Sequence, residues 1–143
     1  MIRDFKENDL SSVMQIWLDS NIEAHSFISA KYWMDHFQLV KKLLPQAEIY
    51  VYENEDMRRI SGFIGLNEDH IEGIFVDKNM RSKGIGKELL DYVKKIKLSM
   101  SLNVYQKNYR AISFYQREHF ATQSENIDNH TNEKELFMIW NKF

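Results

Sequence analysis

The amino-acid sequence predicts an α+β fold, a mixed and mostly antiparallel sheet of about seven strands with helices on both faces. Three observations support this prediction. Two helical patterns precede Pro45, a series of short β-type runs with turn signals between them follows it, and a strand–helix–strand order comes next. The 143 residues fit a single domain, residues 1–143, with no repeat and no linker-like segment.

The first predicted elements are a short strand and a helix. Met1–Phe5 is strand-like, and Asn8 or Asp9 is suited to cap the helix that follows. Asn21–Phe27 is polar and aromatic, and it is predicted to connect this helix to the next one. The helix itself is indicated by apolar residues that recur at i, i+3, i+4 and i+7: Leu10, Val13, Met14 and Trp17.

A second helix is predicted between Ser29 and Pro45. Ser29 has a side chain that can accept a hydrogen bond from the first turn, and Pro45 ends the helix because proline cannot continue the backbone ladder. The helix carries a series of aromatic, histidine and aliphatic residues: Tyr32, Trp33, His36, Phe37, Val40, Leu43 and Leu44.

Three predicted strands follow the second helix and are joined by short turns. Ile49–Tyr52, Ile60–Leu66 and Ile71–Val76 are rich in β-branched and aromatic residues. Asn54–Asp56 and Asn67–Asp69, which lie between them, have the composition of turns. Because such short connections join antiparallel neighbours, the sequence predicts an antiparallel meander.

The second half of the chain is predicted to begin with a helix and a parallel strand. Leu102–Tyr105 is strand-like, and a strand–helix–strand order of this length implies a right-handed crossover. The helix starts in the glycine-rich segment before it, and its predicted buried stripe consists of Ile85, Leu89, Val93, Ile96 and Met100.

The last predicted elements are a short helix and two strands. Asn108 is suited to cap a helix that extends to Tyr115. Phe120–Gln123 and Glu135–Trp140 are strand candidates. Ser124–Asn132 is polar and is predicted to be a loop.

Composition excludes several classes of protein. The net charge of −2 gives no strong basic field for nucleic acid or an anionic membrane, so neither is a predicted partner. The absence of cysteine excludes a disulfide scaffold and cysteine-ligated zinc, and it suits a reducing cytoplasm. No apolar run approaches the ~20 residues of a membrane span. His25 has no second ligand at metal-binding spacing, so no metal site is predicted.

The segment Arg81–Lys87 carries the strongest chemical signal. Gly84 and Gly86 lie between a predicted strand and an amphipathic helix, where glycine lets the backbone approach a ligand closely. Amides at a helix N-terminus point outward and carry partial positive charge, and three basic side chains surround them. These features predict a binding site for a phosphate-bearing ligand, such as a pyrophosphate.

Two common nucleotide motifs fit this segment poorly. A Walker A loop needs glycine at position 81 and serine or threonine at position 88, where the chain has Arg81 and Glu88. A dinucleotide fingerprint needs a small residue where Leu89 stands, and it needs an early parallel strand rather than a meander. A helix that merely begins at a glycine-rich turn remains the alternative without a ligand.

The surrounding pattern resembles the GCN5-related N-acetyltransferase (GNAT) superfamily over the whole chain. In that family a strand is followed by Q/R-x-x-G-x-G/A and later by N-x-x-A-x-x-F-Y. The matching residues here are Arg81, Gly84 and Gly86, and then Asn108, Ala111, Phe114 and Tyr115. Lys78 stands where the family usually has proline. Within the family the chain resembles small bacterial peptidyl-lysine N-acetyltransferases of the YiaC/YjaB type in Trp17–Ser20, His25–Trp33 and Val104–Asn108.

The resemblance implies acetyl-CoA as co-substrate and an amine as acceptor. A main-chain amide of Phe75 or Val76 would polarise the thioester, because the strand that carries them separates from the Asn103–Tyr105 strand in the family. The coenzyme would bind a further set of residues: Arg81, Ser82, Lys83, Gly84, Ile85, Gly86, Lys87, Asn108, Ala111, Phe114 and Tyr115.

Tyr115 is implied as the general acid that protonates the coenzyme A thiolate. A phenol with a pKa near 10 is protonated at neutral pH and can donate to a thiolate. The alternative is a core aromatic residue on a short helix, a role that the adjacent Phe114 can fill.

The general base is expected on the strand before the glycine-rich segment. Glu72 and His70 share one face of that strand by period 2, six residues or fewer before Val76. Either residue is also consistent with an ordinary exposed side chain, and water could carry the proton instead. His25 and Phe27 lie in the predicted connection between the first two helices and are candidates to bind the acceptor.

Three functions are therefore considered. The first is acetyl transfer to a protein lysine, the second is transfer to a small amine or amino-acid derivative, and the third is acyl-CoA binding without turnover. A tyrosine at position 115 counts against the third, because binding alone needs no phenol there. Either a monomer or a homodimer is compatible with the sequence.

Overall fold

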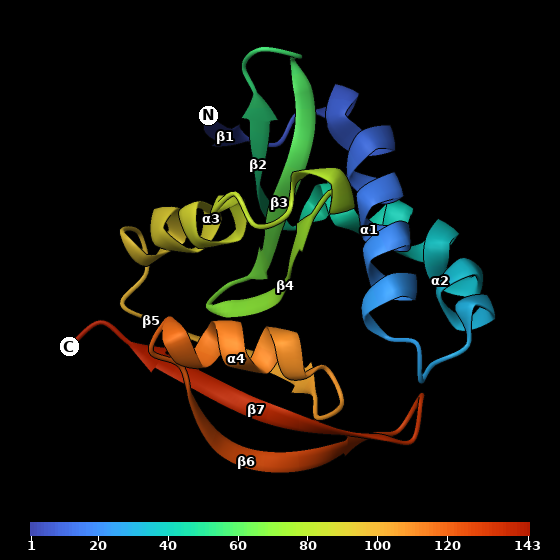
Figure 1. Ribbon diagram of the computed structural model, residues 1–143, viewed down its shortest axis with the longest axis vertical. Helices are drawn as coiled ribbons and strands as arrows, with labels where there is room; N and C mark the ends of the chain where they lie inside the picture. The colour runs from blue at the N-terminus through green and yellow to red at the C-terminus, as the bar shows by residue number, and fades with distance from the viewer.

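The computed structural model describes residues 1–143 and contains seven strands and four α-helices (Figure 1). None of the four α-helices combines the length and the apolar composition that a membrane span requires. The elements, in chain order, are β1 (Ile2–Asp4), α1 (Leu10–Ala24), α2 (Ala30–Leu43), β2 (Glu48–Asn54), β3 (Arg59–Asn67), β4 (His70–Val76), α3 (Ile85–Lys94), β5 (Ser99–Tyr105), α4 (Tyr109–Arg117), β6 (Ala121–Asp128) and β7 (Glu133–Asn141).

All seven strands form one mixed sheet in the order β1-β2-β3-β4-β5-β7-β6. The strands β2, β3 and β4 form the predicted antiparallel meander, and β4 and β5 are parallel neighbours joined through α3. The remaining pairs are antiparallel. The predicted fold class is therefore confirmed.

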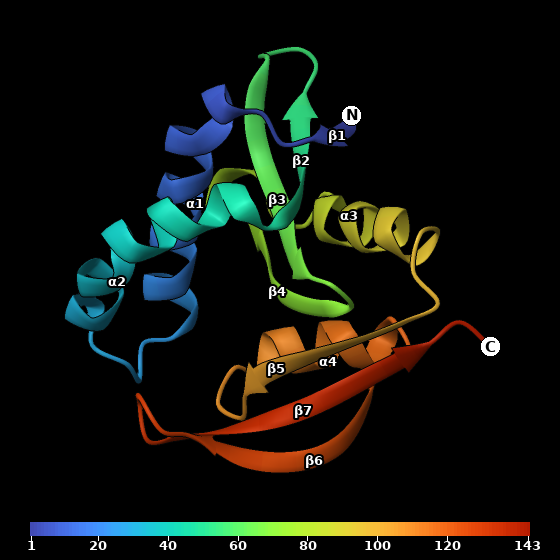
Figure 2. The same cartoon turned by 180° about the vertical axis from the view of Figure 1, so that it is seen from behind.

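Helices cover both faces of the sheet, and the core is divided accordingly. The helices α3 and α4 lie on one face, in front of the sheet in Figure 1, and α1 and α2 lie on the other, as Figure 2 shows from behind. A cluster of 14 buried residues joins α3 and α4 to the sheet, and a second cluster of 10 joins α1 and α2 to it. Each helix pair thus has its own apolar core.

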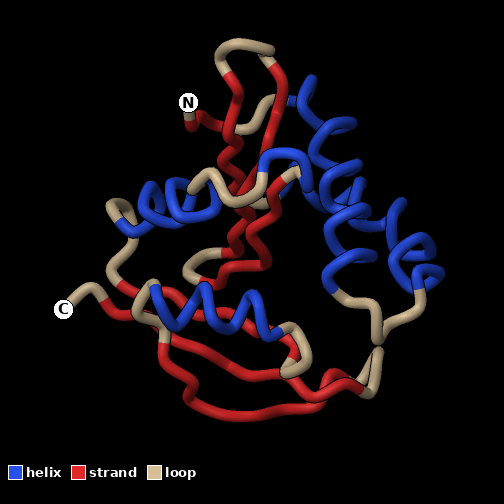
Figure 3. The backbone as a smooth tube through the Cα atoms, in the orientation of Figure 1, coloured by secondary structure: helices blue, strands red, loops and turns tan.

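The strands β4 and β5 separate from each other soon after they meet. They pair only at His70 with Ser101 and at Ile71 with Leu102. On its other side β4 pairs with β3, where Gly65 faces Gly73 and Leu66 faces Ile71, so Glu72 is the extra residue of a β-bulge. The bulge bends β4 away from β5, and the two strands diverge towards α1 and α4 (Figure 3).

Several predicted bounds shift by one to three residues, and the ends of helices α1 and α3 differ most from the prediction. Helix α1 continues to Ala24 through part of the predicted connection. Within this part, the side-chain Nδ2 of the buried Asn21 donates to the main-chain carbonyl of Trp17 at 2.9 Å. Helix α3 ends at Lys94. Met100 is buried in β5, where burial alternates with period 2, and Ile96 lies outside the helix and is 54% exposed. The predicted helical stripe from Ile85 to Met100 therefore spans the helix α3, the connection after it and the strand β5.

The predicted loop Ser124–Asn132 is also corrected, because its first half is strand. The strand β6 continues to Asp128 and pairs with β7 as far as the match of Asp128 with Glu133. It is the edge strand of the sheet, with nearly all of its side chains exposed, so it has no apolar face that the sequence could reveal.

A partly buried ion pair joins β1 to the start of α1. The Arg3 guanidinium donates to both carboxylate oxygens of Asp9 at 2.8 and 3.0 Å, and it also contacts Glu53. The hydrogen bond from Arg3 holds the pKa of Asp9 below its usual value of 3.8, although burial opposes the shift. Since the folded-state pKa is lowered, this stabilisation is complete above pH ~4 and is lost as the pH falls through the folded pKa.

Asp9→Asn is expected to lower the free energy of unfolding at pH 7 by about 1–3 kcal/mol, because it leaves the partly buried Arg3 guanidinium with a weaker partner. Urea denaturation of both proteins at pH 7 and below pH 4 measures this effect, and the difference should shrink at the lower pH. Asp35→Asn is the control, since its pair with Lys31 is exposed and of little consequence. Equal loss in the two variants would contradict a special role for the Asp9 pair.

Candidate active site

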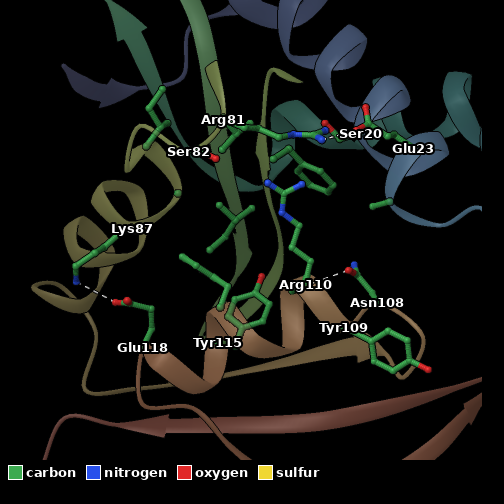
Figure 4. Close-up of a pocket in the computed structure, with 18 of the residues that line it drawn as sticks. Ser20, Glu23, Arg81, Ser82, Lys87, Asn108, Tyr109, Arg110, Tyr115 and Glu118 are labelled. Carbon is green, nitrogen blue, oxygen red and sulfur yellow. Dashed lines mark hydrogen bonds and ion pairs between the residues drawn. The ribbon is translucent and has the colours of Figure 1, made fainter. Parts of the chain in front are cut away.

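A cleft of about 900 Å³ opens at the divergence of β4 and β5. Its walls come from the end of α1, the end of β4, the glycine-rich segment with the start of α3, and α4 (Figure 4). The lining residues from the second half of the chain are Ile74, Phe75, Val76, Met80, Arg81, Ser82, Gly84, Ile85, Gly86, Lys87, Lys107, Asn108, Tyr109, Arg110, Ala111, Phe114, Tyr115, Arg117 and Glu118. The remainder are Ser20, Asn21, Glu23, Ala24 and His25 of the first half.

The glycine-rich segment begins α3 with backbone that only glycine adopts easily. Gly84 has φ +82°, and its carbonyl accepts the first helical hydrogen bond from Glu88. Ser82 is also left-handed, at φ +63°. A Cβ atom added at Gly84 would meet no heavy atom within 4 Å, so the backbone there borders open space. The first amides of a helix have no partner within it. Since Gly84, Ile85, Gly86 and Lys87 line the cleft, this helix start suits an anion.

Charge in the cleft differs in sign from the charge of the chain. The lining contains five basic side chains, Arg81, Lys87, Lys107, Arg110 and Arg117, and two acidic ones, Glu23 and Glu118. The whole chain carries −2. A local positive surplus on a mildly acidic protein favours an anionic ligand at this site.

The two acidic side chains each pair with a basic residue of the cleft. The Arg81 Nη1 lies 2.5 Å from Glu23 Oε1, which joins the glycine-rich segment to α1. The Lys87 Nζ lies 3.1 Å from Oε1 of Glu118, a buried residue at the end of α4. Figure 4 shows both pairs, and it shows Arg110 extending from α4 into the cleft between them. Glu23, Arg110 and Glu118 were not predicted from the sequence.

Tyr115 lies in the wall that α4 contributes. It is 8% exposed, and its ring contacts Phe114 and Phe120 edge to face. Its hydroxyl makes no hydrogen bond with the protein and points into the cleft in Figure 4. Burial raises the pKa of the phenol above its usual value of 10.0, so Tyr115 keeps its proton throughout the neutral range.

Asn108 caps α4 next to the cleft. Its Oδ1 accepts a hydrogen bond from the Ala111 amide at 3.2 Å, as the sequence predicts for an N-cap. Its Nδ2 lies 3.2 Å from Nε2 of His25, which closes α1. The cap therefore joins two walls of the cleft.

Four of the predicted site residues lie outside the cleft lining. Lys83 is exposed in the glycine-rich segment, and Phe27 contacts the rings of His25 and Tyr105. His70 lies where β4 and β5 still pair, and its Nδ1 is 2.8 Å from Ser101 Oγ. Glu72 is the exposed bulge residue at the start of the divergence. The other predicted residues are brought together around the cleft.

Strict alternation along β4 is wrong beyond the bulge. It would place His70 and Glu72 on the face of Val76, yet Ile71 and Val76 pack against the same buried cluster. The extra residue changes the phase of the strand, so His70 and Val76 lie on opposite faces.

The fold and the cleft together define an enzyme class. A mixed sheet that opens between two parallel strands, a glycine-rich helix start and a buried tyrosine suit an acyltransferase that takes its acyl group from a phosphate-bearing thioester.

Comparisons with known proteins identify the family. Residues 45–122 match the acetyltransferase (GNAT) domain. The chain is 36% identical to the peptidyl-lysine N-acetyltransferase YiaC of Escherichia coli K12 over 122 aligned residues, and this alignment covers 84% of this chain and 82% of YiaC. It is 29% identical to the peptidyl-lysine N-acetyltransferase YjaB of the same organism over 119 aligned residues, and this alignment covers 83% of this chain and 80% of YjaB. The chain therefore belongs to the GNAT family and is an N-acetyltransferase with acetyl-CoA as co-substrate.

Solved structures agree with this assignment. The solution structure of apo-form YjaB from Escherichia coli has a TM-score of 0.86 and 26% sequence identity, with 98% of this chain and 96% of that chain covered. The crystal structure of PaiA N-acetyltransferase from Thermoplasma acidophilum in complex with coenzyme A has a TM-score of 0.83 at 20% identity, over 99% and 98% of the two chains. The second likeness shows the shared fold.

Proposed function

We propose that the chain transfers the acetyl group of acetyl-CoA to the side-chain amine of a protein lysine. The observation that carries this proposal is the 36% identity to YiaC, a peptidyl-lysine N-acetyltransferase, over more than four fifths of each chain. The basic lining of the cleft supports the coenzyme half of the reaction, because coenzyme A carries a pyrophosphate and a further phosphate.

In the proposed mechanism both substrates bind before acetyl transfer. The amides of the segment from Arg81 to Lys87 hold the pyrophosphate, and Asn108 binds the pantetheine arm between β4 and β5. A main-chain amide of Phe75 or Val76 donates to the thioester oxygen. The neutral lysine nitrogen attacks the carbonyl carbon, the carbon–sulfur bond breaks, and Tyr115 donates its phenolic proton to the departing thiolate. The nitrogen then releases its surplus proton to water to leave the neutral amide, and the Tyr115 phenolate takes up a proton from water.

A panel of acceptors tests the proposal. Purified protein, acetyl-CoA and lysine-containing peptides with blocked N-termini should release free thiol, and mass spectrometry should find the acetyl group on lysine. Peptides with arginine in place of lysine are the control. Thiol release only with polyamines or amino acids would overturn the lysine assignment in favour of a small acceptor, and coenzyme binding without release on any acceptor would favour a sensor.

We propose Glu72 as the general base, acting through water, with His70 as the second candidate. Support comes from the bulge, which frees Glu72 from the strand ladder at the start of the divergence, where its carboxylate pairs with no basic side chain. The Nδ1 of His70 is already occupied by Ser101. A lysine amine with a pKa near 10.4 is mostly protonated at pH 7, so a base must remove a proton before attack.

Glu72→Gln is expected to lower kcat at pH 7 by about 100-fold. The loss should shrink above pH 10, where the acceptor amine is already neutral. A pH profile of kcat for this variant and for His70→Gln measures both effects. If only His70→Gln loses activity, His70 is the base, and if neither variant loses activity, water alone carries the proton.

We propose further that residues 1–143 act as a single domain in the cytoplasm, as a monomer or a homodimer. All seven strands belong to one sheet, with β1 and β6 at its edges, which supports a single folding unit. Size-exclusion chromatography with light scattering measures the oligomeric state.

A further inference from the structure

His25 joins the end of α1 to the start of α4 through a single contact. It is the residue that ends α1, where its main-chain amide donates to the Asn21 carbonyl at 3.0 Å. Its imidazole Nε2 lies 3.2 Å from the Asn108 Nδ2, although the two residues are 83 positions apart in the chain. Asn108 in turn begins α4. The imidazole is therefore placed to act on a residue of the cleft.

The helix cap fixes which atoms of the Asn108 amide face His25. Only the Oδ1 atom can accept the hydrogen bond from the Ala111 amide, so Nδ2 must face the imidazole. Nδ2 is a donor, and His25 Nε2 must then be an acceptor without a proton. The proton of the neutral ring consequently belongs on Nδ1.

The surroundings of His25 keep the ring neutral and still. It stacks on Trp33 with ring centroids 5.3 Å apart and meets Phe27 and Tyr105 edge to face at 5.7 and 5.0 Å. Burial lowers the pKa of the imidazole from 6.5 to about 4, and the main-chain carbonyl of Asn21 opposes this shift. The Nδ1 atom is buried and makes no hydrogen bond of normal geometry, so the effect of the Asn21 carbonyl on the ring does not come from a well-formed hydrogen bond. Three aromatic rings thus pack around the His25 imidazole, while its Nε2 contacts the Asn108 side chain.

We propose that His25 is a positioning residue that orients the Asn108 carboxamide for coenzyme binding. This inference rests on the proposed function, in which Asn108 binds the pantetheine arm. With Oδ1 held by the α4 amide and one hydrogen of Nδ2 held by His25, the second Nδ2 hydrogen has a fixed direction for a ligand carbonyl. Preorganisation of this kind lowers the ordering cost of binding. The sequence had assigned His25 only to the acceptor.

Three substitutions separate positioning from packing. His25→Phe keeps a ring among the aromatic neighbours but removes the acceptor, and it should raise the KM for acetyl-CoA about threefold to tenfold with kcat within about twofold of wild type. His25→Gln keeps an acceptor near the position of Nε2 and should restore most of the affinity. Trp33→Phe loosens the same aromatic cluster and should lower the unfolding temperature without the change in KM. A wild-type KM in His25→Phe would overturn the proposal.

A double-mutant cycle tests whether His25 acts through Asn108. Asn108→Ser keeps a capping hydroxyl for α4 but lacks Nδ2. In that background His25→Phe should have no further effect on the KM for acetyl-CoA. If the two residues had independent roles, the two increases in KM would multiply, and that result would contradict the proposed coupling.

The tautomer of His25 gives a readout that does not depend on activity. Long-range ¹H–¹⁵N NMR of the wild-type imidazole at pH 7 should place the proton on Nδ1, and a proton on Nε2 or a doubly protonated ring would overturn the proposal. Two other results would instead count against the proposed function: no binding of acetyl-CoA by the wild type, or binding by Asn108→Ser that is as tight as that of the wild type. A weakened Asn108→Ser beside an unchanged His25→Phe would count against the positioning role alone.

Discussion

Tyr115→Phe is expected to lower kcat for acetyl transfer by about 100-fold to 10,000-fold while the KM for acetyl-CoA stays near that of wild type. The hydroxyl points into the cleft and bonds to no protein group, so its removal takes away a proton donor and no structural contact. Burial keeps the pKa of the phenol raised, and the same desolvation raises the pKa of a thiolate formed beside it. The proton transfer therefore remains feasible beside the buried Tyr115 ring.

Tyr92→Phe is the matched control for this substitution. Tyr92 lies on α3, is half-buried and packs against Tyr50 with ring centroids 5.0 Å apart, away from the lining of the cleft. Tyr92→Phe should have the kcat of the wild type, and both Tyr92→Phe and Tyr115→Phe should have the unfolding temperature of the wild type. Steady-state kinetics with thiol detection measure the contrast. Wild-type kcat in Tyr115→Phe would remove the tyrosine from the mechanism.

Gly84→Glu is expected to weaken acetyl-CoA binding by about 100-fold or more. The backbone there is left-handed, at φ +82°, so any side chain adds strain of about 1–2 kcal/mol. The added carboxylate would also stand in open space at the start of α3, where phosphate oxygens are expected to lie. Repulsion between like charges then adds to the strain. Calorimetric titration with acetyl-CoA measures the dissociation constant.

Gly84→Ala separates the two causes. Alanine brings the strain of the left-handed backbone without a charge, so it should lower the free energy of unfolding as much as Gly84→Glu does and weaken binding far less. Equal binding losses in the two variants would mean that backbone strain alone is responsible. In that case the proposed phosphate site at the start of α3 would be wrong.

Most of the fold could be predicted because its signals are local. The change from helical to strand periodicity near Pro45 separates α1 and α2 from the meander. The structure confirms both the two helices and the antiparallel meander. The caps at Ser29 and Asn108 are confirmed as well, since each side chain bonds an amide two or three residues further on. Capping and periodicity depend on neighbours in the sequence, so one sequence is enough to find them.

The parts that escaped prediction depend on contacts between distant residues. The bulge at Glu72 follows from the register of β4 with β3, which the residues of β4 alone do not specify. Glu23 and Glu118 pair with Arg81 and Lys87 across 58 and 31 positions, and an isolated glutamate on a helix gives no sign of such a partner. The edge strand β6 is polar on both faces, so only its pairing with β7 makes it a strand.

The divergence of β4 and β5 has a consequence for how the chain avoids association with other chains. Where the two strands part, each presents main-chain donors and acceptors that no neighbouring strand satisfies, so the centre of this sheet contains two free edges. Free edges invite the addition of foreign strands, and proteins usually protect them at the periphery of a sheet with charge or a bulge. Here the protection is internal: α1 and α4 border the opening, and Glu72 forms a bulge at its narrow end. The walls around these edges, which we propose to accept an extended coenzyme, thus restrict the access of a foreign strand.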